Sequence, residues 1–148
     1  MSHVTTLKVA ILDLDALEEA CQKIGLQFRR GQKTYKWYGR FVGDYREQGT
    51  DPSQMGKCDH AISVPGNSQA YEIGVTWKND HYTLGYDFWG GGFGLEKVAG
   101  PRCQNLIDAY TQTVALKEAT RFAQAEGYTL TSEWDAETNE TVITMRKY

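Results

Sequence analysis

The clearest pattern in the chain is an alternation of apolar and other residues between Tyr71 and Phe88. A period of two is typical of a β-strand that buries one face. Asn79 and Asp80 interrupt the alternation, and such a pair is a favoured two-residue loop of a β-hairpin. This loop fixes the register and gives the hairpin one apolar face. The predicted pairs on that face are Tyr71 with Phe88, Ile73 with Tyr86, Val75 with Leu84, and Trp77 with Tyr82.

The rest of the chain divides into further strands and two helices. Besides the hairpin, the predicted strands are residues 3–11, 61–64, 128–134 and 141–148. One helix follows the first strand and ends at Gly25, and a longer helix runs from Pro101 to Gly127. We therefore predict a single α+β domain over residues 1–148, with an antiparallel sheet of about seven to eight strands and two helices packed on it.

The reverse face of the predicted hairpin carries glycines and acids. The same register places Gly74 opposite Gly85, and Glu72 opposite Asp87. Paired glycines leave bare backbone that another group can approach closely, and two opposed carboxylates repel each other unless a partner compensates them. The candidate partners are a basic side chain, a cation or a ligand, and we expect an arginine from residues 29–46. In the purely structural alternative, a helix packs on the glycines and the acids are solvated or paired with arginine.

A glycine-rich segment follows the hairpin, with the sequence DFWGGGFGLE over residues 87–96. Glycine tolerates positive φ, so this segment is either a tight corner or a rim that admits a ligand. It matches neither the GxGxxG nor the GxxxxGK[ST] phosphate-binding pattern, which favours a structural or recognition corner over a phosphate cradle. The predicted ligand- or partner-binding residues are Glu72, Gly74, Gly85, Asp87, Trp89, Gly90, Gly91, Gly92 and Phe93.

Residues 29–46 carry six basic residues and one acidic residue, with aromatic residues between them. This composition is typical of a platform for single-stranded nucleic acid and also of an ordinary amphipathic strand pair. The strand pair is favoured because alternation alone accounts for the aromatics. It places Tyr35, Trp37 and Phe41 on the core face, and Lys36, Tyr38 and Arg40 in solvent. The nucleic-acid alternative depends on Arg29, Arg30, Lys33, Lys36 and Arg40.

Composition narrows the classes of function. The 148 residues include 16 basic and 19 acidic residues, a net charge of −3, which argues against a protein that binds nucleic acid over its whole surface. The three cysteines are an odd and widely spaced set without a CxxC motif, which argues against a disulfide framework. We therefore expect a cytoplasmic protein, because the cytoplasm keeps thiols reduced. No apolar run is long enough to span a membrane, so no membrane is expected as a partner.

Candidate catalytic and metal-binding residues are few. Cys58 and His60 project to the same side of an extended chain, but two ligands do not make a metal site. Cys21 lies within the apolar stripe of the first helix and is predicted to be buried rather than nucleophilic. A cation-dependent enzyme that uses Glu72 and Asp87 with a histidine is a further alternative. No catalytic signature is present, and we predict no metal and no other cofactor.

Several segments agree in order and spacing with one known family. They are the opening Met1-Ser2-His3 and the runs WYGRFVGDY at 37–45, GKCDHAI at 56–62, YEIG at 71–74 and DFWGG at 87–91. Over essentially its whole length the chain resembles the DUF1257 family, which includes the plastid and cyanobacterial Ycf35 proteins. The resemblance implies no particular reaction, because no catalytic residues are assigned in that family.

The resemblance also bears on partners and on the predicted long loop at residues 43–57. It implies a role in binding a protein partner, for which an AAA-type ATPase is one candidate. The loop resembles the longer bacterial members and not the shorter plastid-type ones, which places a role common to the family outside it. We therefore expect a non-enzymatic binding or adaptor protein.

Overall fold

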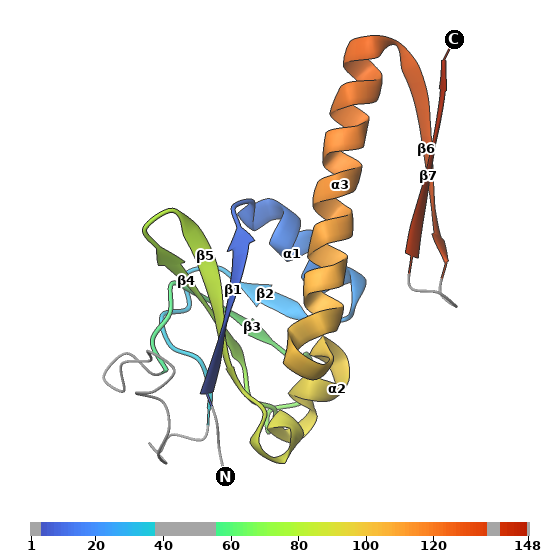
Figure 1. The fold of residues 1–148 in the computed structure, drawn as a ribbon. Coiled ribbons are helices and arrows are strands. Elements are labelled where there is room, and N and C mark those ends of the chain that lie inside the picture. Colours follow the sequence, from blue (N-terminus) through green and yellow to red (C-terminus); the bar gives the residue numbers. More distant parts are fainter. Residues whose placement is uncertain (1–3, 38–55, 136–139, 148) are drawn as a thin grey trace.

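The computed structural model describes residues 4–37, 56–135 and 140–147. Within these ranges the chain forms a five-stranded antiparallel sheet, two long helices, a short helix and a separate two-stranded hairpin (Figure 1). The strands are β1 (Val4–Ile11), β2 (Gln27–Arg29), β3 (His60–Ser63), β4 (Ile73–Lys78), β5 (His81–Asp87), β6 (Tyr128–Asp135) and β7 (Glu140–Lys147). The helices are α1 (Leu14–Lys23), α2 (Leu95–Ala99) and α3 (Gln104–Glu126). The strand order in the large sheet is β1-β5-β4-β3-β2, so the predicted hairpin, β4 and β5, lies inside it.

The loop of the β4–β5 hairpin is the predicted one. Lys78 pairs with His81, which leaves Asn79 and Asp80 as a two-residue loop. Asn79 has a φ of 62°, in the left-handed region that such loops require and that asparagine tolerates better than most residues. The predicted register is therefore confirmed along the paired part of the hairpin.

The apolar face of this hairpin forms the centre of the core. Val75 lies opposite Leu84, and both side chains are fully buried. Trp77 lies opposite Tyr82 in an edge-to-face contact, with ring centroids 4.9 Å apart, but 47% of Trp77 is exposed. The core is thus built on the end of the hairpin away from its loop.

Helices α1 and α3 pack together and bury their apolar residues against this face. Asp13 caps α1, because its Oδ1 atom accepts a hydrogen bond from the main-chain N–H of Ala16 at 3.0 Å. Cys21 is fully buried in α1, as predicted, and burial raises the pKa of its thiol to about 12. A thiol with such a pKa carries almost no thiolate at neutral pH, so Cys21 fills space in the core.

The second long helix, α3, begins later than the sequence pattern predicts. Pro101 opens a separate 3-10 turn, and Arg102 and Cys103 take φ values of 55° and 57°, which break the helix before Gln104. Its end at Gly127, with a φ of 76°, is as predicted. The five-residue helix α2, just before this turn, was not predicted. Within the described ranges, none of the helices combines the length and the apolar character needed to cross a membrane.

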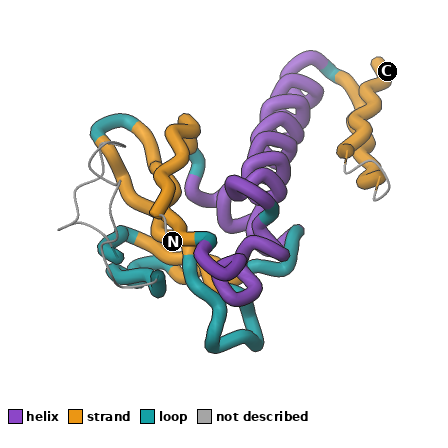
Figure 2. Tube along the Cα trace, turned by 60° about the horizontal axis from the view of Figure 1, so that its bottom comes forward, coloured by secondary structure: helices purple, strands orange, loops and turns teal. Residues whose placement is uncertain are grey.

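The closing hairpin, β6 and β7, does not join the large sheet. It contacts mainly α3, and Figure 2 shows it beyond that helix, away from the other strands. The prediction of one sheet with seven to eight strands is therefore wrong: in the described part of the chain five strands form one sheet and two form another.

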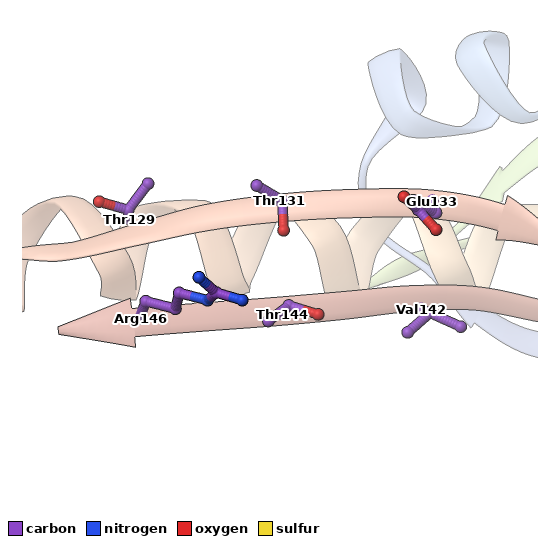
Figure 3. Close-up of a pocket in the computed structure, with 6 residues that line it drawn as sticks. All are labelled: Thr129, Thr131, Glu133, Val142, Thr144 and Arg146. Carbon is purple, nitrogen blue, oxygen red and sulfur yellow. The ribbon is translucent and has the colours of Figure 1, made fainter.

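Six exposed side chains on one face of the β6–β7 hairpin line an open hollow of about 500 Å³ (Figure 3). They are Thr129, Thr131, Glu133, Val142, Thr144 and Arg146.

Two buried tyrosines in the core provide a matched test of packing. The Tyr86 hydroxyl is the only buried side-chain polar atom of the described residues without a hydrogen-bond partner, whereas the Tyr110 hydroxyl accepts from the main-chain N–H groups of Leu12 and Asp13 at 3.1 and 3.2 Å. We expect Tyr86→Phe to raise the free energy of unfolding by about 1 kcal/mol, and Tyr110→Phe to lower it by about 1 to 3 kcal/mol. Urea unfolding of the two variants measures both, and equal losses would contradict the prediction.

Candidate functional site

The glycine-rich segment after β5 forms a left-handed turn, Trp89–Gly94, which we call the aromatic glycine turn. Its φ values are 61° at Gly90, 69° at Gly91, 63° at Gly92 and 53° at Phe93. Four successive residues in this region are costly for side chains with a Cβ, and glycine removes most of that cost. The run of glycines is therefore required by the backbone of the turn, with Phe93 as the one residue that tolerates strain there.

Hydrogen bonds fix the turn from inside. Asp87 accepts from the main-chain N–H of Trp89 at 2.9 Å, and Gly91 donates its N–H to the carbonyl of Phe88 at 2.9 Å. The N–H of Leu95 points to the carbonyls of Gly91 and Gly92. These three amides are used within the turn and are therefore not available to a phosphate group.

Two neighbouring segments hold the turn against the sheet. Tyr71 donates its main-chain N–H to the carbonyl of Gly92 at 2.8 Å. The side-chain amide of Asn67 donates to the carbonyl of Phe93 at 3.0 Å. Neither Asn67 nor Tyr71 belonged to the predicted site, and the sequence gives no local signal of their proximity to the turn.

The turn exposes two aromatic rings. Trp89 is 38% exposed and Phe93 is 46% exposed, and their ring centroids lie 5.8 Å apart. The ring of Tyr71 meets that of Phe93 edge to face at 5.2 Å. The result is a small aromatic surface on a backbone whose conformation is fixed.

A pair of alanine substitutions tests this backbone. Gly91→Ala adds a Cβ with nothing within 4 Å, so it should lower the free energy of unfolding by only about 1 to 2 kcal/mol, the cost of a left-handed φ for alanine. The added Cβ of Gly92→Ala lies 3.0 Å from the Cβ of Leu95 and 3.2 Å from the carbonyl oxygen of Asp87. We expect Gly92→Ala to lower the free energy of unfolding by a further ~1 to 3 kcal/mol, because the backbone carbonyl of Asp87 cannot move away as easily as a side chain. Urea unfolding measures the difference, and a Gly91 variant as unstable as the Gly92 variant would contradict it.

The paired glycines of the hairpin lie under Tyr35. Gly74 pairs with Gly85 as predicted, and the buried ring of Tyr35 lies directly on them. An ideal Cβ at Gly74 would lie 2.5 Å from the Cε1 atom of that ring, and one at Gly85 would lie 3.1 Å from its hydroxyl. The close approach expected at this bare backbone is therefore made by a side chain of the protein, not by a helix, and leaves no room there for a ligand.

The two acids of the predicted patch have different environments. Glu72 precedes β4, and its Oε1 atom accepts from the main-chain N–H of Lys36 at 2.9 Å and from the side-chain amide of Gln32 at 3.2 Å. Asp87 ends β5 and is fully buried. The donors found at Glu72 come from the basic stretch, as expected, but they are amides and not the expected arginine. The paired register ends at Gly74 and Gly85, so the predicted Glu72–Asp87 pair is not part of the ladder.

The basic stretch is not the predicted strand pair where the structure describes it. Only Gln27–Arg29 is a strand, and an isolated bridge joins Thr34 to Lys57. Tyr35 is buried, while Trp37 is partly buried and Lys36 exposed, so the predicted facing agrees even without the strand. The burial of Tyr35 removes one ring that a nucleic acid would stack on.

The basic side chains of this stretch make several contacts within the protein. The Arg30 guanidinium lies 2.6 Å from Asp15 and 2.8 Å from Glu18. Arg29 donates to the hydroxyl of Ser63 at 3.0 Å, and Lys36 donates to the carbonyl of Ser68 at 2.5 Å. Lys33 is exposed. Tyr38, Arg40 and Phe41 lie outside the described residues, as do residues 43–55 of the predicted long loop.

Cys58 and His60 both contact the segment that precedes Tyr35. The Cys58 thiol donates to the carbonyl of Gln32 at 3.1 Å, and burial raises its pKa to about 11. The Nδ1 atom of His60 accepts the main-chain N–H of Gly31 at 3.0 Å. Among the residues that the structure describes, no three His, Cys, Asp or Glu side chains gather as metal ligands would.

His60 makes stability depend on pH. Burial lowers the pKa of His60 from its usual 6.5, and Lys33 and Arg30 lower it further, although Asp59 opposes them. The unfolded state therefore binds the proton more readily, so the stability present above about pH 6.5 should fall as the pH drops below it. Protonation of Nδ1 would also break the bond from Gly31.

The comparison is urea unfolding at about pH 7.5 and about pH 5.5 for the wild type and His60→Gln. The wild type should lose more stability than the variant over this interval, because glutamine does not titrate. Equal losses in the two proteins would contradict the prediction.

The predicted site residues thus fall into two places. Trp89, Gly90, Gly91, Gly92 and Phe93 form the exposed aromatic glycine turn, with Asp87 bonded beneath it. The remaining residues of the set, Glu72, Gly74 and Gly85, hold the segment around Tyr35 against the sheet. No family model, curated protein or solved structure matches this chain, so its likeness to the DUF1257 family remains a resemblance.

Proposed function

We propose that this chain is a non-enzymatic binding protein that holds a protein partner at the aromatic glycine turn. The observation that supports it is the exposure of Trp89 and Phe93 together on a hydrogen-bonded left-handed backbone. Large aromatic side chains provide most of the energy in many protein interfaces. A turn that is already fixed loses little conformational freedom on binding, so more of the contact energy appears as affinity.

The use of the acidic residues within the fold also supports binding over catalysis. Asp87 is buried and accepts the N–H of Trp89, and Glu72 holds the main chain at Lys36. A cation-dependent enzyme would need both carboxylates directed to a common open site. We infer that the acids shape the surface and that the rings make the contact.

The test is capture of partners from the native host with cross-linking and mass spectrometry, followed by binding assays with the purified partner. Trp89→Ala with Phe93→Ala should weaken binding at least about tenfold, in the range of interface hot spots. Trp77→Ala is the matched control, because Trp77 is 47% exposed but belongs to the β4–β5 hairpin.

The proposed DUF1257 relationship makes an AAA-type ATPase the first partner to assay directly. Retention of the partner by Trp77→Ala and its loss by the double variant are the expected results. A partner bound equally by both variants, or no partner captured by the wild type, would contradict the proposed function.

A further inference from the structure

The β6–β7 hairpin has a long, regular outer edge. Its ladder runs without a bulge from the pair Tyr128–Lys147 to the pair Asp135–Glu140. In the described part of the chain the sheet ends at these two strands, and apart from β6 the main contacts of β7 are with α3. Figure 3 shows the helix α3 behind the hairpin.

Such an edge favours pairing with another strand. A two-stranded sheet is marginally stable by itself, and its outer N–H and C=O groups form a ready template. Proteins usually protect an edge with proline, a bulge or charges along its middle. The five central residues of β7, 141–145, are uncharged and include no proline. Val142, Ile143 and Thr144 among them are β-branched, a residue type that favours strand pairing.

The charges on β7 select the orientation and the partner. Glu140 begins the strand, whereas Arg146 and Lys147 end it. In an antiparallel pair of identical strands centred on Ile143, position 140 of one copy lies opposite position 146 of the other, and position 142 lies opposite position 144. Glu140 then meets Arg146 twice by symmetry, and β-branched residues meet between them.

The edge of β6 lacks this complementarity. Its charged residues, Glu133 and Asp135, both lie at one end and are both acidic, so an antiparallel pair of β6 strands brings no opposite charges together. Within one hairpin the two acidic residues Asp135 and Glu140 lie opposite each other at one end. A second copy paired with β7 would bring its Arg146 to that acidic end.

We propose that a second copy of this chain pairs with the outer edge of β7, which joins the two hairpins into one four-stranded antiparallel sheet about a two-fold axis at Ile143. This interface is separate from the aromatic glycine turn, so the two surfaces can be occupied together. The association rests on one strand pair and two symmetric charge pairs, so we expect a reversible dimer that weakens as salt rises.

The experiment is sedimentation velocity of the full chain from micromolar to millimolar concentration. The wild type should dimerise, and Glu140→Arg or Arg146→Glu alone should raise the dimer Kd about tenfold or more, because each places like charges opposite one another. An equimolar mixture of the two variants should restore dimerisation, since the arginine introduced at position 140 of one chain then faces the glutamate introduced at position 146 of the other. Glu133→Arg, a charge reversal on β6, is the control and should leave the dimer Kd unchanged.

Recovery in the mixture separates pairing from misfolding, because two damaged proteins would not restore each other. A wild type that stays monomeric over the whole range would overturn the proposal. So would a dimer that withstands both single reversals, since its interface would then lie elsewhere, or a mixture that dimerises no better than its components.

Discussion

Gly74→Ala is expected to lower the free energy of unfolding by roughly 3 kcal/mol, because the new Cβ would overlap the ring of Tyr35. Its ideal position lies 2.5 Å from Cε1 of that ring and closer still to Cδ1. The backbone of Tyr35 is held in place by the bond from its main-chain N–H to the carbonyl of Gly56 at 2.9 Å, and its ring is buried, so relief of the overlap requires repacking of the ring. Gly85→Ala should cost less, because its Cβ meets only the tyrosine hydroxyl, at 3.1 Å.

A double-mutant cycle isolates this contact. Tyr35→Ala alone should cost about 3 to 5 kcal/mol, as for other buried aromatic residues. With the ring removed, Gly74→Ala should change sign and stabilise by roughly 0.5 to 1 kcal/mol, because glycine inside a strand is less favourable than alanine. Urea unfolding of the four proteins gives the coupling energy. Additive effects would show that Tyr35 does not lie on Gly74.

Leu84→Ala should destabilise the protein by about 2 to 5 kcal/mol, through lost burial and the cavity that remains. Leu84 is fully buried opposite Val75, between the sheet and the helices. Chemical denaturation measures the loss, with Lys78→Ala on the exposed end of the same hairpin as a control that should change stability by less than about 0.5 kcal/mol. A similarly small effect of Leu84→Ala would contradict its place at the centre of the core.

The parts of the fold that follow from local signals could be predicted. Asn79 and Asp80 determine the register of the central hairpin, and Gly25 and Gly127 mark the ends of the helices, because turn chemistry acts over a few residues. The assignment of β6 and β7 to a second sheet could not be predicted, since alternation shows which face of a strand is apolar but not which element will cover it. The broken start of α3 depends on positive φ at Arg102, a residue type that gives no warning of it.

The candidate site was predicted in part for the same reason. Gly74 opposite Gly85 correctly indicated a close approach to bare backbone, but the approaching group, Tyr35, is distant in the sequence. The carboxylate of Glu72 needed a partner, and its amide donors also come from this distant segment. The sequence thus indicated the positions that require a contact, but only the tertiary fold shows which residues make it.

The junction between the segments around Tyr35 and Gly56 acts as a clamp. The main chain is joined at this point by two hydrogen bonds, Tyr35 to Gly56 and Cys58 to Lys33, both 2.9 Å long. Between them lies the isolated bridge that pairs Thr34 with Lys57. Because these bonds hold the backbone of Tyr35 against residues 56–58, they also keep its ring on Gly74 and Gly85, so the clamp closes one face of the central hairpin.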